Sequence, residues 1–204
     1  MPARRDGQAR YAGRMNAPLV YLIGWPAVGK WSVAQELARE RGWQVVDNHL
    51  VADPIFAVIG ADGVAPKPPG TGALVQRVRA AVLEAAATLA PPGVGFVFTN
   101  VLFDEPEDRE TYSQVRDVAA RRGAVFVPVV LQARDEALRE RIVSPGRTVR
   151  RKPRSGHVLD RYRDRPPFVP THPHTLVLDT TALSVQDAAG RVLRHVDACL
   201  EARG

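Results

Sequence analysis

The stretch Gly24-Trp25-Pro26-Ala27-Val28-Gly29-Lys30 decides the fold of this chain. It follows an apolar run, Leu19 to Ile23, and precedes a segment from Ser32 to Arg41 with the polar and apolar spacing of a helix. Glycines at these positions let consecutive backbone N–H groups approach a polyphosphate, and the N-terminus of the helix adds its positive end. The sequence therefore predicts a phosphate-binding loop between a strand and a helix.

Lys30 ends this motif and is one of only three lysines in the chain. We expect its ammonium group to neutralise the phosphates and to follow the transferred group as a point charge. The usual motif continues with a serine or threonine that holds Mg²⁺, whereas Trp31 stands here and the hydroxyl comes at Ser32. We predict that all residues from Gly24 to Ser32 contact the nucleotide and that Ser32 contacts the phosphates or a metal-bound water.

Length and composition predict a single domain. The chain has 204 residues, 45% of them hydrophobic and 25% charged, and no apolar run approaches the roughly 20 residues that cross a bilayer. Residues 1–16 are basic and lack an apolar core, so we expect a disordered tail before a domain of residues 17–204. The single Cys199 cannot form an internal disulfide and is expected to be a core thiol. A soluble, cytoplasmic protein fits this composition.

Short apolar runs alternate with helical patterns along the whole chain, which is typical of a three-layer α/β/α sandwich around a parallel sheet. The five expected strands are Leu19–Ile23, Trp43–Val46, Val94–Phe98, Ala124–Leu131 and Thr175–Asp179. The longer helices are expected at Ser32–Arg41, Ala73–Ala90, Pro106–Arg122 and Ser184–Ala202, with a short helix at Arg134–Arg141.

Two details of the second quarter of the chain are predicted from spacing. Asp53 is expected to cap a short helix through Val58, and the proline-rich residues 60–72 to be irregular, giving a substrate flap over about residues 48–72. The helix after the flap is expected to turn one apolar stripe inward; the stripe consists of Val75, Val78, Val82, Ala85 and Leu89.

Polar residues follow the second and third strands. Ligands of open α/β sheets gather at the carboxyl ends of strands, so Asp47, Asn48 and His49 are predicted to bind a phosphoryl acceptor. Asp47 is the candidate general base, although a carboxylate here also suits a helix cap. Thr99 and Asn100 are expected at the same edge.

The metal ligands are less clear from the sequence. Asp104 is the nearest acid after the third strand, and with Ser32 it is the candidate Mg²⁺ ligand. His172 and His174 have the spacing of two metal ligands, but no further ligands follow at suitable spacing.

Positive charge is concentrated between Arg139 and Arg165, a stretch that contains ten arginines and lysines but only three acidic residues. Glycines and prolines in the same stretch favour a mobile lid, at about residues 143–166, that closes over phosphates. We predict that Arg147, with Arg150 or Arg151, supplies charge to the transferring group. The alternative is a solvated basic face without a catalytic part.

The arrangement resembles the small P-loop kinases, such as adenylate, shikimate and gluconate kinases, over nearly the whole chain after Met15. It is most similar to bacterial proteins often labelled shikimate-kinase-like or AAA-type ATPase, through Gly24–Ala34, Asn48-His49-Leu50 and Asp179-Thr180-Thr181. The resemblance implies ATP and Mg²⁺ as cofactors. In spacing, Arg141 and Arg147 resemble the kinase arginines that stack on adenine and touch transferring phosphates.

Two functions remain open from the sequence. The first is an ATP-dependent kinase for a small-molecule hydroxyl or phosphate; shikimate itself is disfavoured, because the acid-x-acid pair after the second strand and the triple glycine after the third are missing. The second is a nucleic-acid-associated NTPase or polynucleotide kinase that grips a backbone with the arginine-rich segment. Only Tyr162 and Phe168 are aromatic near that segment, which gives little support to base stacking and favours the kinase.

Overall fold

The structure is a computed structural model that describes residues 17–61, 65–143, 157–160 and 164–203. The expected tail (residues 1–16) lies outside the described residues. So do most of the expected lid and its arginines Arg147, Arg150 and Arg151.

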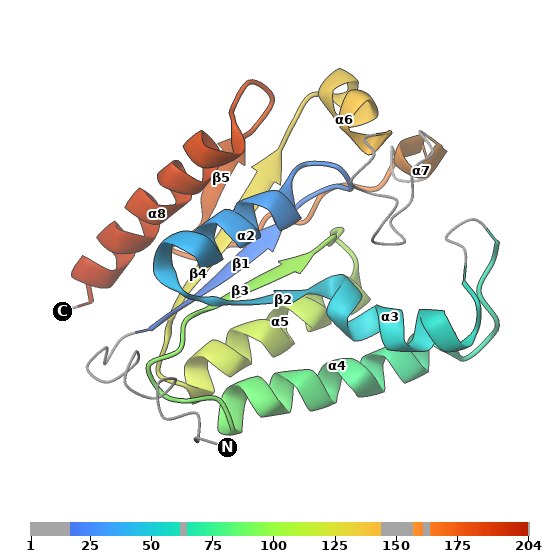
Figure 1. Cartoon of the computed structure of the whole chain (residues 1–204), viewed down its shortest axis with the longest axis horizontal. Helices are drawn as coiled ribbons and strands as arrows, with labels where there is room; N and C mark the ends of the chain where they lie inside the picture. The colour runs from blue at the N-terminus through green and yellow to red at the C-terminus, as the bar shows by residue number, and fades with distance from the viewer. Residues whose placement is uncertain (1–16, 62–64, 144–156, 161–163, 204) are drawn as a thin grey trace, which may run out of the picture.

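One parallel sheet of five strands forms the middle of the molecule, in the order β2-β3-β1-β4-β5 (Figure 1). The strands are β1 (Pro18–Ile23), β2 (Gln44–Asp47), β3 (Phe96–Asn100), β4 (Val125–Gln132) and β5 (Leu176–Asp179). All five expected strands are therefore present, and the predicted three-layer fold is confirmed.

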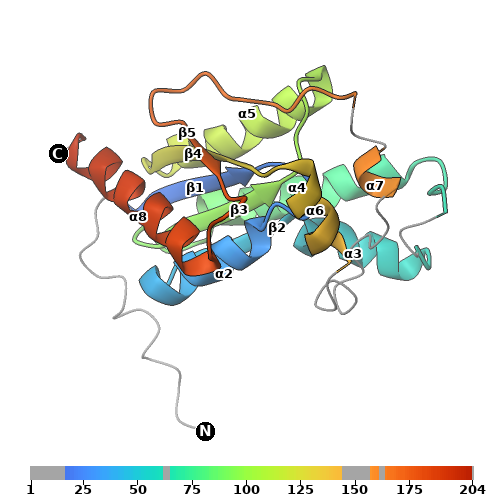
Figure 2. The same ribbon diagram turned by 90° about the horizontal axis from the view of Figure 1, so that it is seen from above.

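Seven helices are described around this sheet. They are α2 (Lys30–Arg41), α3 (Asn48–Val58), α4 (Thr71–Thr88), α5 (Pro106–Arg121), α6 (Asp135–Ile142), α7 (His157–Asp160) and α8 (Val185–Glu201). Figure 2 shows the strands between α5 on one side and α2 with α8 on the other, and α3, α6 and α7 gathered at one end of the molecule. No helix in the described part of the chain is long and apolar enough to span a bilayer.

The central strand β1 is buried along its whole length and supplies both cores. Leu19, Tyr21 and Ile23 face the helices α4 and α5, whereas Val20 and Leu22 face α2 and α8. Side chains of a strand alternate between its two faces, so an unbroken apolar run is what a strand covered on both sides requires. Burying each such side chain contributes roughly 1.5–3 kcal/mol.

Two local predictions about the flap and the third strand are wrong. Helix α3 begins at Asn48 with Asp47 as its N-cap, and Asp53 lies inside the helix instead of capping it. The first half of the expected flap is thus helical. Strand β3 also runs two residues further than expected, so Thr99 and Asn100 are buried strand residues instead of loop residues.

The buried face of α4 also differs from the predicted stripe. Its buried residues are Thr71, Arg79, Leu83 and Ala86, whereas Leu89 is 81% exposed. The predicted stripe is offset from this face: Val75, Val78 and Val82 are half-buried, and the pattern left out Leu83 and Ala86 as well as the charged Arg79. Arg79 is the charged residue on this buried face, at a position where periodicity expects an apolar side chain.

Candidate functional site

The loop between β1 and α2 has the backbone that its glycines permit. Gly29 is the N-cap of α2 with a φ of 100°, and Ala27 is the single non-glycine residue with a positive φ (67°) among the described residues. Gly24 has a φ of 152°, and a Cβ there would lie 2.4 Å from the carbonyl oxygen of Leu131 in β4. Gly24 therefore serves close packing against the sheet as well as the turn itself.

Lys30 is folded over the loop that precedes it. Its Nζ donates hydrogen bonds to the carbonyl oxygens of Gly24, at 2.6 Å, and Trp25, at 2.9 Å. These contacts keep the ammonium group beside the loop backbone, where the sequence motif expects phosphates. Ser32, in the first turn of α2, is exposed.

The segment after β5 joins the loop from the other side. Thr180 is buried, and its hydroxyl lies 3.2 Å from the carbonyl oxygen of Val28 in the loop and 3.0 Å from that of Gln132. The guanidinium group of Arg141, at the end of α6, donates to the carbonyl oxygens of Thr180 (2.8 Å) and Thr181 (3.0 Å). Arg141 thus lies beside the phosphate loop, held by the Asp179-Thr180-Thr181 motif.

Asp47 is buried at the carboxyl end of β2, with 5% of its surface exposed. Its Oδ1 accepts from the backbone N–H of His49 at 2.8 Å, and its Oδ2 accepts from the hydroxyl of Thr99 at 3.2 Å. The carboxylate therefore caps α3 and is fixed in place by the neighbouring strand. An N-cap of this kind satisfies a backbone donor that a helix leaves without an internal partner.

A second polar cluster lies next to Asp47. Asn48 Oδ1 accepts from the Nη2 atom of Arg79, at 2.7 Å, and from the side-chain amide of Asn100, at 3.0 Å. The cluster joins the first residue of α3, the last residue of β3 and the middle of α4. Sequence reasoning missed Arg79, and a buried charge within an otherwise apolar face leaves no periodic signal.

His49 points along its own helix. Its Nδ1 lies 3.1 Å from the Oδ1 atom of Asp53, one turn further on. A carboxylate on one ring nitrogen fixes the tautomer and the ring orientation. The prediction that His49 contacts substrate is not tested by this contact.

The two candidate metal ligands are not brought into one cluster. Asp104 forms an ion pair with Arg109 at 2.7 Å, and Ser32 belongs to α2. Within the described ranges, no three His, Cys, Asp or Glu residues come together as a metal site. A magnesium ion bound to nucleotide phosphates needs few protein ligands and keeps several of its waters. The hydroxyl of Ser32 could therefore contact such an ion through one of those waters.

The end of the expected lid is tied to the loop after β3. The Nε atom of Arg165 donates to Glu105 at 2.7 Å, and its guanidinium lies over the ring of Phe103 at 3.9 Å. The N–H of Asp104 donates to the carbonyl oxygen of Pro166 at 3.0 Å. One anchor of the segment between α6 and β5 is therefore fixed beside the site.

The donor half and the acceptor half of the predicted site adjoin each other. Ile23 and Asn100 are register partners in the neighbouring strands β1 and β3, and the N–H of Gly24 donates to the carbonyl oxygen of Asn100 at 3.3 Å. The structure thus brings together the loop, Lys30, Asp47, Asn48 and Asn100. It leaves Asp104 in an ion pair outside this group.

Solved structures with similar folds cover almost the whole chain. A gluconokinase from Sinorhizobium meliloti 1021 has a TM-score of 0.64 at 17% identity, over 92% of this chain and 95% of its own. An APS kinase from Mycobacterium tuberculosis, in complex with AMPPNP and APS, has a TM-score of 0.55 at 22% identity, over 89% and 98%. A shikimate kinase from Acinetobacter baumannii, in complex with shikimate, has a TM-score of 0.54 at 17% identity, over 94% and 97%.

These likenesses confirm the expected P-loop fold. No curated protein matches the sequence. The model of the family described as AAA domain matches residues 19–167. Since that match spans well over half of the chain and includes the phosphate loop, the protein belongs to the AAA domain family.

Proposed function

We propose that this protein is an ATP-dependent phosphotransferase that moves the γ-phosphoryl group to a small-molecule acceptor. The observation that carries the proposal is the direct contact between the phosphate loop and the polar end of β3, through the hydrogen bond from Gly24 to Asn100. Phosphoryl transfer needs the donor and acceptor sites next to each other, so that the attacking and leaving oxygens lie in line with the transferred group. The fold likeness to gluconokinase, APS kinase and shikimate kinase supports the same class of reaction.

Lys30 has the central role in the proposal. Its ammonium group contacts the carbonyl oxygens of Gly24 and Trp25 in this structure, and we expect it to exchange them for the β- and γ-phosphate oxygens when ATP binds. A preformed positive charge that meets charge developing in the transition state is the main way in which such enzymes act. Arg141 and Arg147 are proposed to contribute further charge near the nucleotide.

Asp47 is the proposed general base. The hydrogen bonds from His49 N–H and the Thr99 hydroxyl fix its position at the carboxyl end of β2, where a carboxylate can take the proton of an acceptor hydroxyl. Asn48, His49, Thr99 and Asn100 are proposed to orient that acceptor.

ATP would bring Mg²⁺, which neutralises charge on the phosphate oxygens. Ser32 is the proposed contact to the hydrated ion, and Asp104 would have to leave its ion pair with Arg109 to take part. The single Cys199 is buried, and an unpaired core thiol agrees with a proposed cytoplasmic location.

The first experiment measures ADP release from ATP and Mg²⁺ with a panel of acceptors: nucleosides, nucleoside monophosphates, sugars, sugar acids, shikimate and aminoglycosides. We expect one class to raise ADP release well above the rate without acceptor. Lys30→Ala should lower that rate by about 10²- to 10³-fold, as removal of a transition-state donor does.

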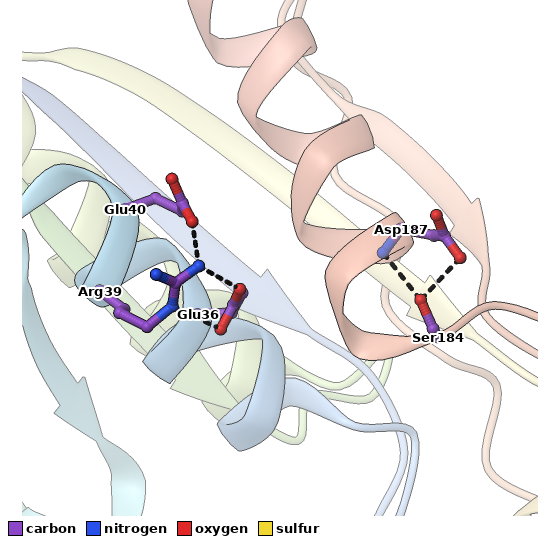
Figure 3. A network of polar contacts seen from close by, with 5 residues as sticks. All are labelled: Glu36, Arg39, Glu40, Ser184 and Asp187. Carbon is purple, nitrogen blue, oxygen red and sulfur yellow. Dashed lines mark hydrogen bonds and ion pairs between the residues drawn. The ribbon is translucent and has the colours of Figure 1, made fainter.

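Arg39→Ala is the matched control for Lys30→Ala. It removes one positive charge from the same helix, but Arg39 faces solvent and pairs with Glu36 and Glu40 (Figure 3). Its rate should equal that of the wild type. The kinase proposal fails if single-stranded DNA or RNA stimulates ADP release and no small molecule does, and steep loss of that stimulation with salt would then identify a nucleic-acid clamp.

A further inference from the structure

Arg79 is a buried arginine with unusually few partners. It belongs to α4, only 8% of its surface is exposed, and its Nε–H has no hydrogen-bond partner among the described residues. Its one hydrogen bond goes from Nη2 to the neutral amide oxygen of Asn48, at 2.7 Å. Buried charges in proteins are normally paired with an opposite charge and fully hydrogen-bonded.

Arg122 shows what a purely structural arginine looks like in the same layer of this molecule. Its guanidinium donates to the backbone carbonyl oxygens around the end of α4; these belong to Ala86, Ala90, Pro91, Pro92 and Val94. The hydrogen bonds of Arg122 therefore stabilise the fold. Arg79 retains donor capacity that the described part of the chain does not use.

The Nη2 end of the Arg79 guanidinium lies at the acceptor end of the site. Arg79 and Asn100 both donate to Asn48 Oδ1, and Asn100 is the residue whose carbonyl oxygen accepts from Gly24 of the phosphate loop. The cluster thus adjoins the loop without belonging to it. Burial lowers the pKa of Arg79, and the nearby Tyr21 and Asp108 only partly oppose this effect.

We propose that Arg79, together with Asn48 and Asn100, binds an anionic group of the phosphoryl acceptor, a carboxylate or a phosphate. The inference rests on the proposed function and adds the charge of the substrate to it. A guanidinium group offers its donors in a planar fork that matches the oxygens of both anions. An acceptor anion would supply the hydrogen-bonded counter-charge that Arg79 lacks among the described residues, since the nearby Asp108 forms no hydrogen bond with it.

The test compares acceptors in matched pairs that differ in one anionic group, such as gluconate with sorbitol and a nucleoside monophosphate with its nucleoside. We expect the anionic member of one pair to stimulate ADP release at least ten times more strongly than the neutral member. Which pair responds distinguishes a carboxylate from a phosphate. Stimulation by neutral acceptors alone would overturn the inference and leave the kinase proposal standing.

Substitution of Arg79 tests the residue itself. A hydrogen-bonded charge pair of this kind is worth about 10- to 150-fold in binding, so Arg79→Met should raise the KM for the anionic acceptor by that factor. Arg79→Lys should recover part of it, and the KM for ATP should stay unchanged. Arg122→Met is the control, which should lower the Tm but leave both KM values as in the wild type. An unchanged acceptor KM in Arg79→Met would assign Arg79 to the fold alone.

A binding measurement keeps the inference testable if no acceptor stimulates ADP release. With the phosphate loop saturated by AMPPNP and Mg²⁺, the Tm is followed as phosphate or citrate is added to the wild type and to Arg79→Met. A larger rise in Tm in the wild type than in Arg79→Met would establish the anion site even though the kinase proposal had failed, since these salts raise the Tm of both proteins to some extent. Equal shifts in both proteins would overturn the site.

Discussion

At the scale of single residues, the two glycines of the phosphate loop are required for different reasons. Gly24 combines a positive φ with a close approach to the carbonyl oxygen of Leu131, whereas Gly29 has a positive φ and open space around it. We expect Gly29→Ala to lower the free energy of unfolding by about 1–2 kcal/mol through backbone strain. Gly24→Ala should cost about 3 kcal/mol or more, because overpacking adds to the strain.

Urea unfolding of the two variants checks this difference. The pair forms its own control, since both substitutions add the same methyl group within the same loop. Equal losses in free energy of unfolding would show that the contact with β4 does not constrain Gly24.

Asp47 combines two roles that one pair of variants can separate. Asparagine is as good an N-cap as aspartate, so Asp47→Asn should keep the free energy of unfolding within about 1 kcal/mol of the wild type. If Asp47 is the general base, the same variant should lower the acceptor-dependent kcat by about 10²- to 10⁴-fold.

Asp47→Ala serves as the comparison. It loses the cap as well as the base, and should lower the free energy of unfolding by about 1 kcal/mol more than Asp47→Asn does. A kcat near that of the wild type in Asp47→Asn would reduce Asp47 to a helix cap. Both variants need kinetics and urea unfolding on the same preparation.

At the scale of elements, α8 begins with Ser184 as its N-cap. Ser184 Oγ accepts from the N–H of Asp187 at 3.0 Å and donates to its carboxylate at 2.6 Å (Figure 3). We expect Ser184→Ala to lower the free energy of unfolding by about 1 kcal/mol, measured by urea titration. Ser184→Thr should retain most of it, because threonine keeps the hydroxyl. A threonine variant as unstable as the alanine variant would rule out the cap as the cause.

Helix α4 has a buried face that apolar periodicity predicts only in part. The apolar stripe predicted from Val75 to Leu89 is offset from the real buried face, where Arg79 sits between Thr71 and Leu83. Periodicity assigns charged residues to solvent, since arginine is rarely buried. A buried arginine such as Arg79 departs from this rule and is for that reason a candidate functional residue. The two ends of α4 were predicted within two residues.

At the scale of the whole molecule, stability should depend on pH through His172. Burial lowers the pKa of His172 from its ordinary value of 6.5, with help from the neighbouring His174 and Arg116. Its Nδ1 accepts a hydrogen bond from the N–H of His174 at 3.2 Å, which requires the neutral ring. In the unfolded chain His172 therefore binds a proton as the pH falls below about 6.5, whereas in the folded chain it stays neutral to lower pH. Stability should fall as pH drops below about 6.5.

The measurement is the urea midpoint of unfolding between pH 8 and pH 5, for the wild type and for His172→Phe. The phenylalanine ring keeps the edge contact with Phe126 but cannot titrate, so its midpoint should fall less over this range. The variant also loses the hydrogen bond from His174 N–H, which lowers its midpoint at every pH but does not add to the change of midpoint with pH. Equal slopes would show that His172 does not control the pH dependence.

Much of the fold could be predicted because its signals are local. The phosphate loop and the five apolar runs each depend on a few consecutive residues, and each is present in the structure. Strand ends were the weaker part. Asn100 is polar and looks like a loop residue, yet the ladder with Ile23 of β1 keeps it within β3.

The sequence by itself determined the class of fold, the phosphate loop and the polar residues at the strand ends, because these follow from periodicity and from the backbone freedom of glycine. Only the tertiary structure decided which polar groups meet. The contact of Arg79 with Asn48 joins residues 31 positions apart, and that of Thr180 with Val28 joins residues 152 positions apart. Such pairs leave no pattern along the chain, since they exist only once the sheet and its helices have packed.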